Sequence, residues 1–312
     1  MAIKVLVTGG AGYIGSILIP RLLDSGYEVT VVDNFMYKQT SLVENILRKN
    51  FKLIIDDVRN LQSMKKIYSK HDVIVPLAAI VGAPACDKDP TLASSVNKTS
   101  IIELLSNIHQ DQIVIMPTTN SAYGSGDSNN FCDESSPLSP ISLYAKDKVE
   151  VEKTLMERSN SVSFRLATVF GLSPRMRLDL LVNNFVFRAV TDGFIVIFEG
   201  NFKRNYIHIS DVATAFQIAI QTPSNFVGEI FNVGLSEANI SKIELCKKIA
   251  EKLSTFTFIE SQIGKDPDQR NYIVSNKKIE SRGFMPKISL DEGLTELISG
   301  IKIFNNKPYS NI

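Results

Sequence analysis

The sequence lacks the residues that would suggest disulfide bonds, a metal site or attraction to a polyanion. Its three cysteines, Cys86, Cys132 and Cys246, lie far apart and show no metal-ligand spacing with the three histidines, so neither disulfides nor a metal centre are expected. With 34 Lys and Arg against 33 Asp and Glu, the net charge is +1. This charge favours neither nucleic acid nor an anionic membrane as a partner. The absences are typical of a protein of the reducing cytoplasm.

Long apolar runs are also missing. No segment approaches the ~18 apolar residues that cross a bilayer, and the N-terminus runs directly into Lys4–Gly9 without the pattern of a signal peptide. We therefore expect no membrane partner. The 312 residues are 44% hydrophobic, 8% aromatic and 21% charged, as in an ordinary globular protein with one large core or with a lobe attached.

The first 33 residues carry the most specific local pattern. An apolar run over residues 3–7 predicts a buried parallel strand, and an apolar-periodic segment through Leu23 predicts a helix. Between them, Gly10, Gly12 and Gly15 satisfy G-x-G-x-x-G, in which small residues let the backbone approach a pyrophosphate at the helix N-terminus. The pattern predicts a dinucleotide-binding turn.

A second strand, expected over residues 28–32, ends at Asp33. An acidic residue at this distance from the glycines accepts hydrogen bonds from the adenosine ribose hydroxyls. Because its carboxylate would repel a 2′-phosphate, the sequence predicts NAD rather than NADP. The alternative is a glycine-rich turn in a doubly wound protein that binds no cofactor.

Gly9, Gly12 and Gly15 also form T-G-x-x-G-x-x-G, and with this motif the chain resembles the extended short-chain dehydrogenase/reductase family of NAD-dependent nucleotide-sugar epimerases and dehydratases. The resemblance covers nearly the whole chain. It implies a Rossmann-type doubly wound parallel α/β sheet over residues 1–165, which carries the catalytic residues, and a smaller α/β nucleotide-sugar-binding lobe over residues 166–312, with some chain crossing back. Family members commonly form homodimers, so a homodimer is expected.

The resemblance also assigns residues to the cofactor. An acidic-apolar pair after the third strand matches a pair near the adenine, and the small-residue turn after the fourth strand lies beside the cofactor in relatives. Many members carry a histidine just before this turn, where this chain has Pro76. The expected cofactor-binding residues are Gly9, Gly12, Tyr13, Ile14, Gly15, Asp33, Asn34, Asp57, Val58, Leu77, Ala78, Ala79, Asn97, Tyr144 and Lys148.

Tyr144 and Lys148 are four residues apart, so in a helix their side chains lie side by side. A phenol titrates near pH ~10 and is a poor base at neutral pH unless a nearby cation favours the phenolate. Lys148 is the expected cation. Such a pair alone is common on surface helices, but the resemblance adds Thr119, which corresponds to the residue that orients the substrate oxygen. Thr119, Tyr144 and Lys148 are the expected catalytic residues.

The residues after Thr119 limit which reactions the chain is expected to catalyse. Nucleotide-sugar 4,6-dehydratases of the family carry Asp-Glu at this point, whereas this chain has Asn120 and Ser121, which supply neither an acid nor a base at neutral pH. Dehydration is therefore disfavoured. Cys86 lies near a turn where some double epimerases hold a catalytic cysteine. Because no partner lysine is evident, we interpret it as a small apolar residue.

Three residues of the second half are expected to bind the nucleotide sugar. The resemblance matches Asn184 and Arg204 to residues at the diphosphate, where a guanidinium offers paired donors, and Arg270 lies near a phosphate- or ribose-binding arginine of relatives. Arg175 and Arg177 either face the sugar pocket or lie on the surface. No metal ligands are expected.

Two polar residues near Arg204 are given structural roles. His208 lies in an apolar strand and is expected to be a packed histidine rather than a catalytic one. Asp211 is expected to cap the following helix.

The implied function is NAD-dependent oxidation of a nucleotide-linked sugar at C4, with Tyr144 as the base and Thr119 orienting the hydroxyl. The 4-keto sugar is either released by a 4-dehydrogenase or reduced on its other face by a C4 epimerase. The loop at 117–121 and the segments at 174–177 and 266–268 look most like dehydrogenases of GDP-linked heptoses in capsule or lipopolysaccharide biosynthesis, which we favour. A non-catalytic dinucleotide-binding sensor is the alternative from another class.

Overall fold

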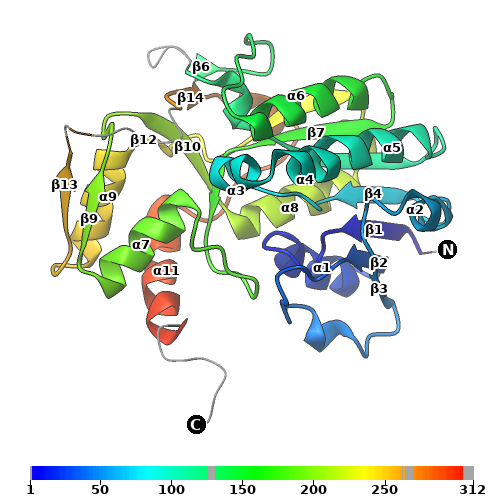
Figure 1. Ribbon diagram of the computed structural model, residues 1–312, viewed down its shortest axis with the longest axis horizontal. Coiled ribbons are helices and arrows are strands. Elements are labelled where there is room, and N and C mark those ends of the chain that lie inside the picture. The colour runs from blue at the N-terminus through cyan, green and yellow to red at the C-terminus, as the bar shows by residue number, and fades with distance from the viewer. Residues whose placement is uncertain (1, 126–130, 262, 264–269, 305–312) are drawn as a thin grey trace.

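A parallel β-sheet forms the centre of the computed structural model, which describes residues 2–125, 131–261, 263 and 270–304 (Figure 1). The sheet contains β1 (Lys4–Thr8), β2 (Glu28–Asp33), β3 (Phe51–Ile55), β4 (Val73–Pro76), β5 (Ile113–Thr119), β7 (Ser161–Leu166) and β11 (Glu229–Val233). Its seven strands are ordered β11-β7-β5-β4-β1-β2-β3, and each neighbouring pair is parallel. The order reverses between β1 and β4, the kind of switch point at which doubly wound sheets bind ligands. The predicted Rossmann-type α/β fold is confirmed.

Helices cover both faces of this sheet (Figure 1). One face carries α1 (Gly15–Asp24) and α8 (Ile209–Gln221), and the other carries α2 (Leu61–Tyr68), α5 (Ser100–Ser106) and α6 (Leu143–Leu155). In β1, Val5 and Val7 belong to the cluster packed on α1 and α8, whereas Leu6 packs with Met64 of α2. The strand is therefore apolar on both faces, as a buried parallel strand requires.

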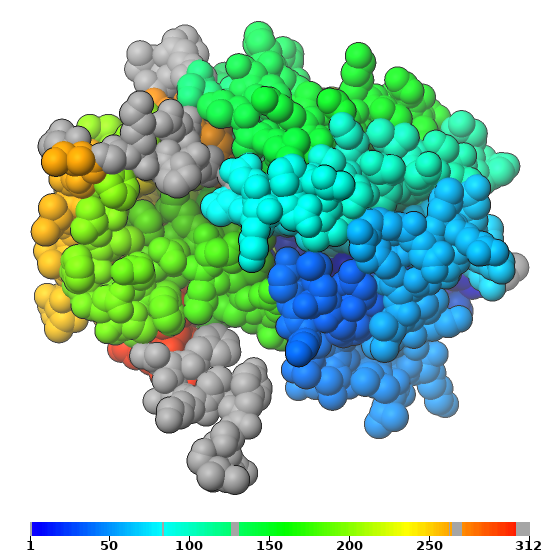
Figure 2. All heavy atoms as spheres, viewed as in Figure 1, coloured from blue at the N-terminus to red at the C-terminus, as the bar shows by residue number. Residues whose placement is uncertain are grey.

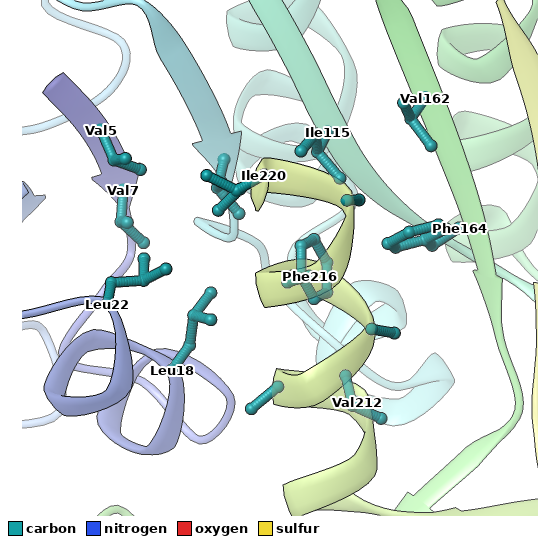
Figure 3. Close-up of a cluster of buried hydrophobic side chains, with 14 of the residues drawn as sticks. Val5, Val7, Leu18, Leu22, Ile115, Val162, Phe164, Val212, Phe216 and Ile220 are labelled. Carbon is teal, nitrogen blue, oxygen red and sulfur yellow. The ribbon is translucent and has the colours of Figure 1, made fainter. Parts of the chain in front are cut away.

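The largest hydrophobic cluster lies between the sheet and the helices α1 and α8. Figure 3 shows Leu18 and Leu22 of α1 and Phe216 of α8 pointing toward the strands. The ring of Phe216 lies edge-on to Phe164 of β7, with centroids 5.2 Å apart. Because α8 comes late in the chain but packs beside α1, this cluster joins the two halves of the sequence.

A second lobe contains most of the remaining elements, with a core that includes Phe170, Leu245 and Leu294. Its elements are β8 (Thr168–Phe170), α7 (Leu181–Thr191), β9 (Phe194–Ile197), β10 (Lys203–His208), β12 (Asn239–Ser241), α9 (Lys242–Lys252), β13 (Thr257–Glu260) and α11 (Leu290–Phe304). The chain also returns to the first sheet through α8, β11 and α10 (Lys277–Ser281). The division of the chain near residue 165 stays a prediction.

A run of short helices connects β4 to α5. It consists of α3 (Ala83–Lys88), α4 (Pro90–Ser94) and the π-helical turn η2 (Ser95–Thr99). Figure 2 shows this region in cyan, between the blue surface of the first lobe and the green surface of the second. A π-helical turn widens the helix locally and often occurs at functional sites.

The smaller elements complete the described chain. They are the 3₁₀ turns η1 (Val43–Asn45), η3 (Asn120–Tyr123) and η4 (Pro223–Asn225), and the paired strands β6 (Phe131–Cys132) and β14 (Ile273–Val274). Within the described residues, none of the helices has the length and apolar character needed to cross a membrane. The same residues contain no cluster of side chains that could hold a metal ion.

The prediction for Asp211 is wrong. Helix α8 is capped by His208, whose Nδ1 accepts the backbone N–H of Ser210 at 3.3 Å. Asp211 lies buried in the first turn, and its carboxylate accepts the backbone N–H groups of Lys287 and Ile288 at 3.0 Å each. An acidic residue in the first turn of a helix can thus accept hydrogen bonds from a distant loop instead of capping its own helix.

His208 has the packed position expected from the sequence. Its side chain is buried, its ring lies edge-on to Phe170 with centroids 5.4 Å apart, and its Nε2 lies 2.6 Å from a carboxylate oxygen of Glu296 on α11. Because Nδ1 accepts the Ser210 N–H, the hydrogen of the ring lies on Nε2, which donates a hydrogen bond to Glu296.

Candidate active site

The glycine turn lies directly against the turn that follows β4. Gly9 has φ of +65°, and a Cβ at this position would lie 2.5 Å from the backbone of Ala78. A Cβ on Gly15 would lie 2.2 Å from the carbonyl oxygen of Gly10. On Gly12, by contrast, the only described contact would be the Gly9 oxygen at 3.0 Å. The first and last glycines permit close packing, and the middle one leaves room for a phosphate.

Asp33 lies at the end of β2 beside this turn. Its Oδ2 accepts the backbone N–H of Ala11 at 3.0 Å, and its Oδ1 accepts the N–H of Phe35 at 2.9 Å and the Gln39 amide at 3.2 Å. A carboxylate has about four acceptor positions, so capacity remains for a ribose hydroxyl. The turn and the acid form one site that fits the adenosine diphosphate half of NAD.

Asp57, at the end of β3, is held by two neighbours. Arg59 donates to both carboxylate oxygens at 2.8 Å, and the amide of Asn34 donates to Oδ2 at 3.0 Å. The hydrogen bond from Arg59 is the main reason why the pKa of Asp57 lies well below its usual value. Asp57 is therefore ionised and fixed near Asn34, as its expected place at the adenine requires. Arg59 was not identified from the sequence, although the spacing Asp-x-Arg indicates such a pair.

Asn97 fixes the turn after β4. It is fully buried in η2, and its side chain accepts the N–H of Ile80 and donates to the carbonyl of Ile80, both at 2.8 Å. The turn 77–79, which contains the expected cofactor residues Leu77, Ala78 and Ala79, begins with a hydrogen bond from the Leu77 N–H to Thr8 at 2.9 Å. Asn97 therefore fixes the backbone of Ile80, the residue directly after this turn.

The phenol of Tyr13 points away from the glycine turn. It donates to the carbonyl of Gly171 at 2.7 Å and accepts from the amide of Asn183 at 3.1 Å, and burial raises its pKa well above the ordinary value. The Ser173 hydroxyl donates to the Tyr13 carbonyl at 2.9 Å and lies 2.7 Å from the hydroxyl of Ser16. The side chain and the carbonyl of Tyr13 thus join the glycine turn to the second lobe.

Thr119 ends β5 and caps η3. Its hydroxyl donates to the hydroxyl of Ser121 at 2.8 Å and accepts the Ser121 N–H at 3.0 Å. Arg270 donates to the same Ser121 hydroxyl. The structure thus brings together Thr119, Ser121 and Arg270, a grouping that local sequence patterns did not indicate.

Tyr144 and Lys148 lie together on α6, as their spacing predicts. Helix α6 begins after Ser142, whose hydroxyl accepts the N–H of Ala145 at 3.3 Å. The Nζ of Lys148 lies 5.9 Å from the centroid of the Tyr144 ring, and Lys148 lines one narrow cavity with Thr119. Lys148 therefore lies close both to the Tyr144 ring and to Thr119 at the end of β5.

Burial is the main cause of the shifted pKa values of Tyr144 and Lys148. It raises the pKa of Tyr144 to about 12, although the guanidinium of Arg177, and more weakly that of Arg270, act to lower it. Burial also lowers the pKa of Lys148 to about 8, opposed by the carboxylate of Asp147. Near neutral pH the phenol is therefore protonated, and the ammonium is close to losing its proton.

Arg177 lies near the turn after β4 and Tyr144, whereas Arg175 contacts the loop after β2. Arg177 donates to the carbonyl of Val81 at 3.5 Å and to the carboxylate of Asp179, with Nε at 3.0 Å from Oδ1, and it acts on the Tyr144 phenol. It therefore belongs to the site. The guanidinium of Arg175 lies over the ring of Tyr37, 4.8 Å from its centroid.

The expected substrate residues lie on separate elements. Arg204 is buried on β10, and Arg204 and Arg270 both act to lower the pKa of the buried Tyr206 phenol, which burial raises. These two arginines therefore face a common region. Asn184 is partly buried on α7, where its amide donates to the carbonyl of Leu178 at 3.0 Å.

Cys86 has an apolar environment behind Tyr144. It is fully buried in the cluster that contains Ile80, Ala93 and Val96, with Tyr144 packed against it. Its thiol donates to the carbonyl of Ile80 at 3.4 Å, and burial raises its pKa. These surroundings agree with the interpretation of Cys86 as a packing residue.

A doubly wound sheet with this glycine turn, and a tyrosine and lysine at its carboxyl edge, define a dinucleotide-dependent enzyme. The chain belongs to the NAD-dependent epimerase/dehydratase family, whose model matches residues 5–234. As a member it is an NAD-dependent enzyme, and NAD is its cofactor. Gly9, Gly12, Gly15 and Asp33 have the geometry that this cofactor needs.

Known proteins of the family resemble the chain over nearly its whole length. The chain is 26% identical to the UDP-N-acetyl-alpha-D-glucosaminuronate decarboxylase of Bacillus cytotoxicus, covering 97% of this chain and 99% of the relative. The UDP-glucuronic acid 4-epimerase of Bacillus cereus, solved with UDP-glucuronic acid and NAD, has a TM-score of 0.84 at 26% identity, covering 97% and 100% of the two chains. The Thermus thermophilus UDP-glucose 4-epimerase, solved with NAD, has a TM-score of 0.82 at 25% identity, covering 96% and 99%.

Proposed function

We propose that the protein oxidises C4 of a sugar linked to a nucleoside diphosphate. The observation that carries this proposal is that Lys148 lies 5.9 Å from the centroid of the Tyr144 ring and lines a narrow gap with Thr119, the last residue of β5. The relatives support it, because the solved Bacillus cereus and Thermus thermophilus proteins are named as 4-epimerases of UDP-linked sugars.

In this proposal Tyr144, as its phenolate, accepts the proton of the C4 hydroxyl and becomes a neutral phenol, and the Thr119 hydroxyl orients the substrate oxygen. NAD supplies the acceptor for the hydride and adds positive charge when it is oxidised. Each pKa unit corresponds to ~1.4 kcal/mol, so a phenol with a pKa of about 12 needs added positive charge to work near neutral pH. Lys148, Arg177 and Arg270 supply the cations of this chain.

The finer proposal is a GDP-heptose-type 4-dehydrogenase of surface-polysaccharide biosynthesis that acts as a cytoplasmic homodimer. Asn120 and Ser121 support oxidation without elimination, because neither supplies an acid or a base. A C4 epimerase is the second candidate, and it is favoured by the names of the two structural neighbours. In both cases Asn184, Arg204 and Arg270 bind the nucleotide sugar.

The test follows NADH at 340 nm after purified protein meets NAD and a panel of nucleotide sugars that includes GDP-heptose, UDP-glucose and UDP-glucuronic acid. A dehydrogenase gives NADH and a ketone by NMR, whereas an epimerase gives the C4 epimer without net NADH. Tyr144→Phe should abolish both products and keep NAD binding, and Tyr37→Phe is the matched control. Binding of NAD with no product from any sugar would favour the sensor.

A further inference from the structure

A buried carboxylate lies inside the catalytic segment without a role in the proposed reaction. Asp147 stands between Tyr144 and Lys148 on α6 and is only 2% exposed. Burial of a carboxylate is costly unless the charge is paired or hydrogen-bonded. Its partners therefore indicate what it does.

The partners of Asp147 come from the connection between α4 and η2. Its Oδ2 accepts the hydroxyl proton of Ser94 at 2.8 Å, and its Oδ1 lies 3.6 Å from the ammonium of Lys98. Lys98 also pairs with the more exposed Glu150 at 2.9 Å. Asp147 thus fastens the catalytic helix to the π-helical turn η2.

The same turn fixes the opposite side of the site. Asn97, the residue before Lys98, holds both backbone groups of Ile80 after β4. Adjacent residues of η2 therefore hold the cofactor turn through Ile80 and the catalytic helix through Asp147. A substitution of Asp147 would remove the contact between η2 and α6 and leave the hydrogen bonds of Asn97 with Ile80 in place.

Asp147 directly precedes Lys148 on α6, and both residues are only 2% exposed, so its carboxylate acts on the ammonium in a poorly solvated environment and raises the pKa of Lys148. The other groups that face Lys148 are the thiol of Cys86 on α3, and Tyr144 and Glu152 one helical turn away on α6. Glu152 is neutralised by Arg165, 2.6 Å away in a buried pair. The Cys86 thiol is protonated at neutral pH because burial raises its pKa.

We propose that Asp147 is a positioning residue of the catalytic centre, which holds α6 against η2 and keeps the ammonium of Lys148 charged. A neutral amine cannot stabilise the Tyr144 phenolate, so the carboxylate would act on the reaction through Lys148. The effect on catalysis rests on the proposed function, whereas the effect on the charge of Lys148 does not.

The test is the titration of Lys148 in Asp147→Asn, in the full-length protein with NAD. Enzyme labelled with [ε-¹³C]lysine is titrated by NMR, and the Lys148 signal is assigned with Lys148→Arg. We expect the pKa of Lys148 to fall by about one unit, so that the charged fraction of Lys148 and the rate of sugar oxidation at pH 8 both fall about fivefold. Substrate and NAD affinities should change less than the rate.

Two further variants test the proposal independently in case Asp147→Asn does not fold. Lys98→Met removes the cation that shares the Asp147 carboxylate, so the pKa of Lys148 should rise. Glu150→Gln removes the exposed partner of Lys98 and should leave the pKa of Lys148 and the rate nearly unchanged. An unchanged Lys148 titration in both Asp147→Asn and Lys98→Met would overturn the proposal. A shifted titration in a protein that oxidises no sugar would support the role of Asp147 and reject the proposed function.

Discussion

The guanidinium of Arg175 lies over the ring of Tyr37, 4.8 Å from its centroid, and this contact joins the segment after β8 to the loop after β2. The segment is also fastened to the glycine turn, through the hydrogen bonds of Tyr13 with Gly171 and of Ser173 with Tyr13. The chain from Gly171 to Arg175 therefore connects two of the loops that we propose hold the adenosine end of the cofactor.

Removal of the Arg175–Tyr37 contact should loosen this connection and weaken NAD binding. An exposed cation–π contact contributes ~0.5–1 kcal/mol, so Tyr37→Ala and Arg175→Ala should each raise the dissociation constant for NAD about two- to fivefold. Calorimetric titration measures the change. The double variant should be no weaker than the worse single variant, because both remove one contact. Arg48→Ala, which affects a surface pair with Asp24, is the control.

Gly9 is expected to tolerate no side chain. Its φ of +65° and the approach of Ala78 to 2.5 Å from a built Cβ mean that alanine would be strained and would also push apart two cofactor loops. Gly26 has φ of +83° but no described atom within 4 Å of a built Cβ, so Gly26→Ala carries only the backbone strain of about 1–2 kcal/mol.

Urea unfolding and NAD titration separate the two effects. Gly9→Ala should lose more stability than Gly26→Ala and should bind NAD at least tenfold more weakly. Equal stability losses with unchanged NAD binding in both variants would show that the contact between Gly9 and Ala78 does not shape the site.

Local patterns were sufficient for the glycine turn, Asp33 and the Tyr144–Lys148 pair, because strand ends, turn glycines and helical spacing each fix neighbours in the sequence. The fold follows from the same signals, since alternating strands and helices predict a parallel sheet. The prediction that Asp211 caps α8 was wrong because its carboxylate accepts hydrogen bonds from backbone N–H groups more than 70 positions later, which local patterns do not indicate.

The residues of the proposed sugar site could not be predicted from local patterns. The contact of Arg270 with Ser121 joins residues 149 positions apart, and Arg177 reaches the β4 turn across 96 positions. Such contacts depend on how the second lobe packs on the first, which spacing within a segment does not encode.

The buried pair of Glu152 and Arg165 should be costly to break. Arg165 donates to both carboxylate oxygens of Glu152, and the hydroxyls of Thr118 and Ser163 donate to the same side chain at 2.9 and 2.6 Å. Glu152→Gln leaves a buried guanidinium without its countercharge, which typically costs about 3–5 kcal/mol.

Chemical denaturation tests this pair by comparison with a double variant. Glu152→Met with Arg165→Met removes both charges, so its free energy of unfolding should exceed that of Glu152→Gln. If Glu152→Gln unfolds at the same urea concentration as wild type, the pair contributes little to stability.

The rate of the proposed oxidation should rise with pH and then level off. The phenolate fraction of Tyr144, whose pKa is about 12 without ligand, increases with pH. Above pH 8 the ammonium of Lys148, with a pKa of about 8, loses its charge and no longer favours the phenolate. Single-turnover NADH formation between pH 6 and 10 measures both the rise of the rate and its plateau. In Lys148→Arg the cation persists at every pH tested, so the plateau should disappear.

Lys148 should make the protein less stable than it would be with a neutral side chain. Burial lowers its pKa from the ordinary value of 10.5 to about 8. The folded state therefore binds fewer protons than the unfolded state between pH 8 and 10.5. At ~1.4 kcal/mol per unit, the cost of the buried charge is of order 3 kcal/mol below pH 8, and it is relieved as the pH rises through this window.

Lys148→Met should accordingly be more stable than wild type at pH 7, with the difference shrinking by pH 10, and it should be inactive at both. Urea unfolding at the two pH values measures the difference. Lys98→Met is the matched control, because the hydrogen bond with Glu150 raises the pKa of Lys98 and its removal should not stabilise the protein. A Lys148→Met protein that is less stable than wild type at pH 7 would mean that the packing of the lysine stem outweighs its buried charge. Such a result would place the value of Lys148 in structure as well as in catalysis.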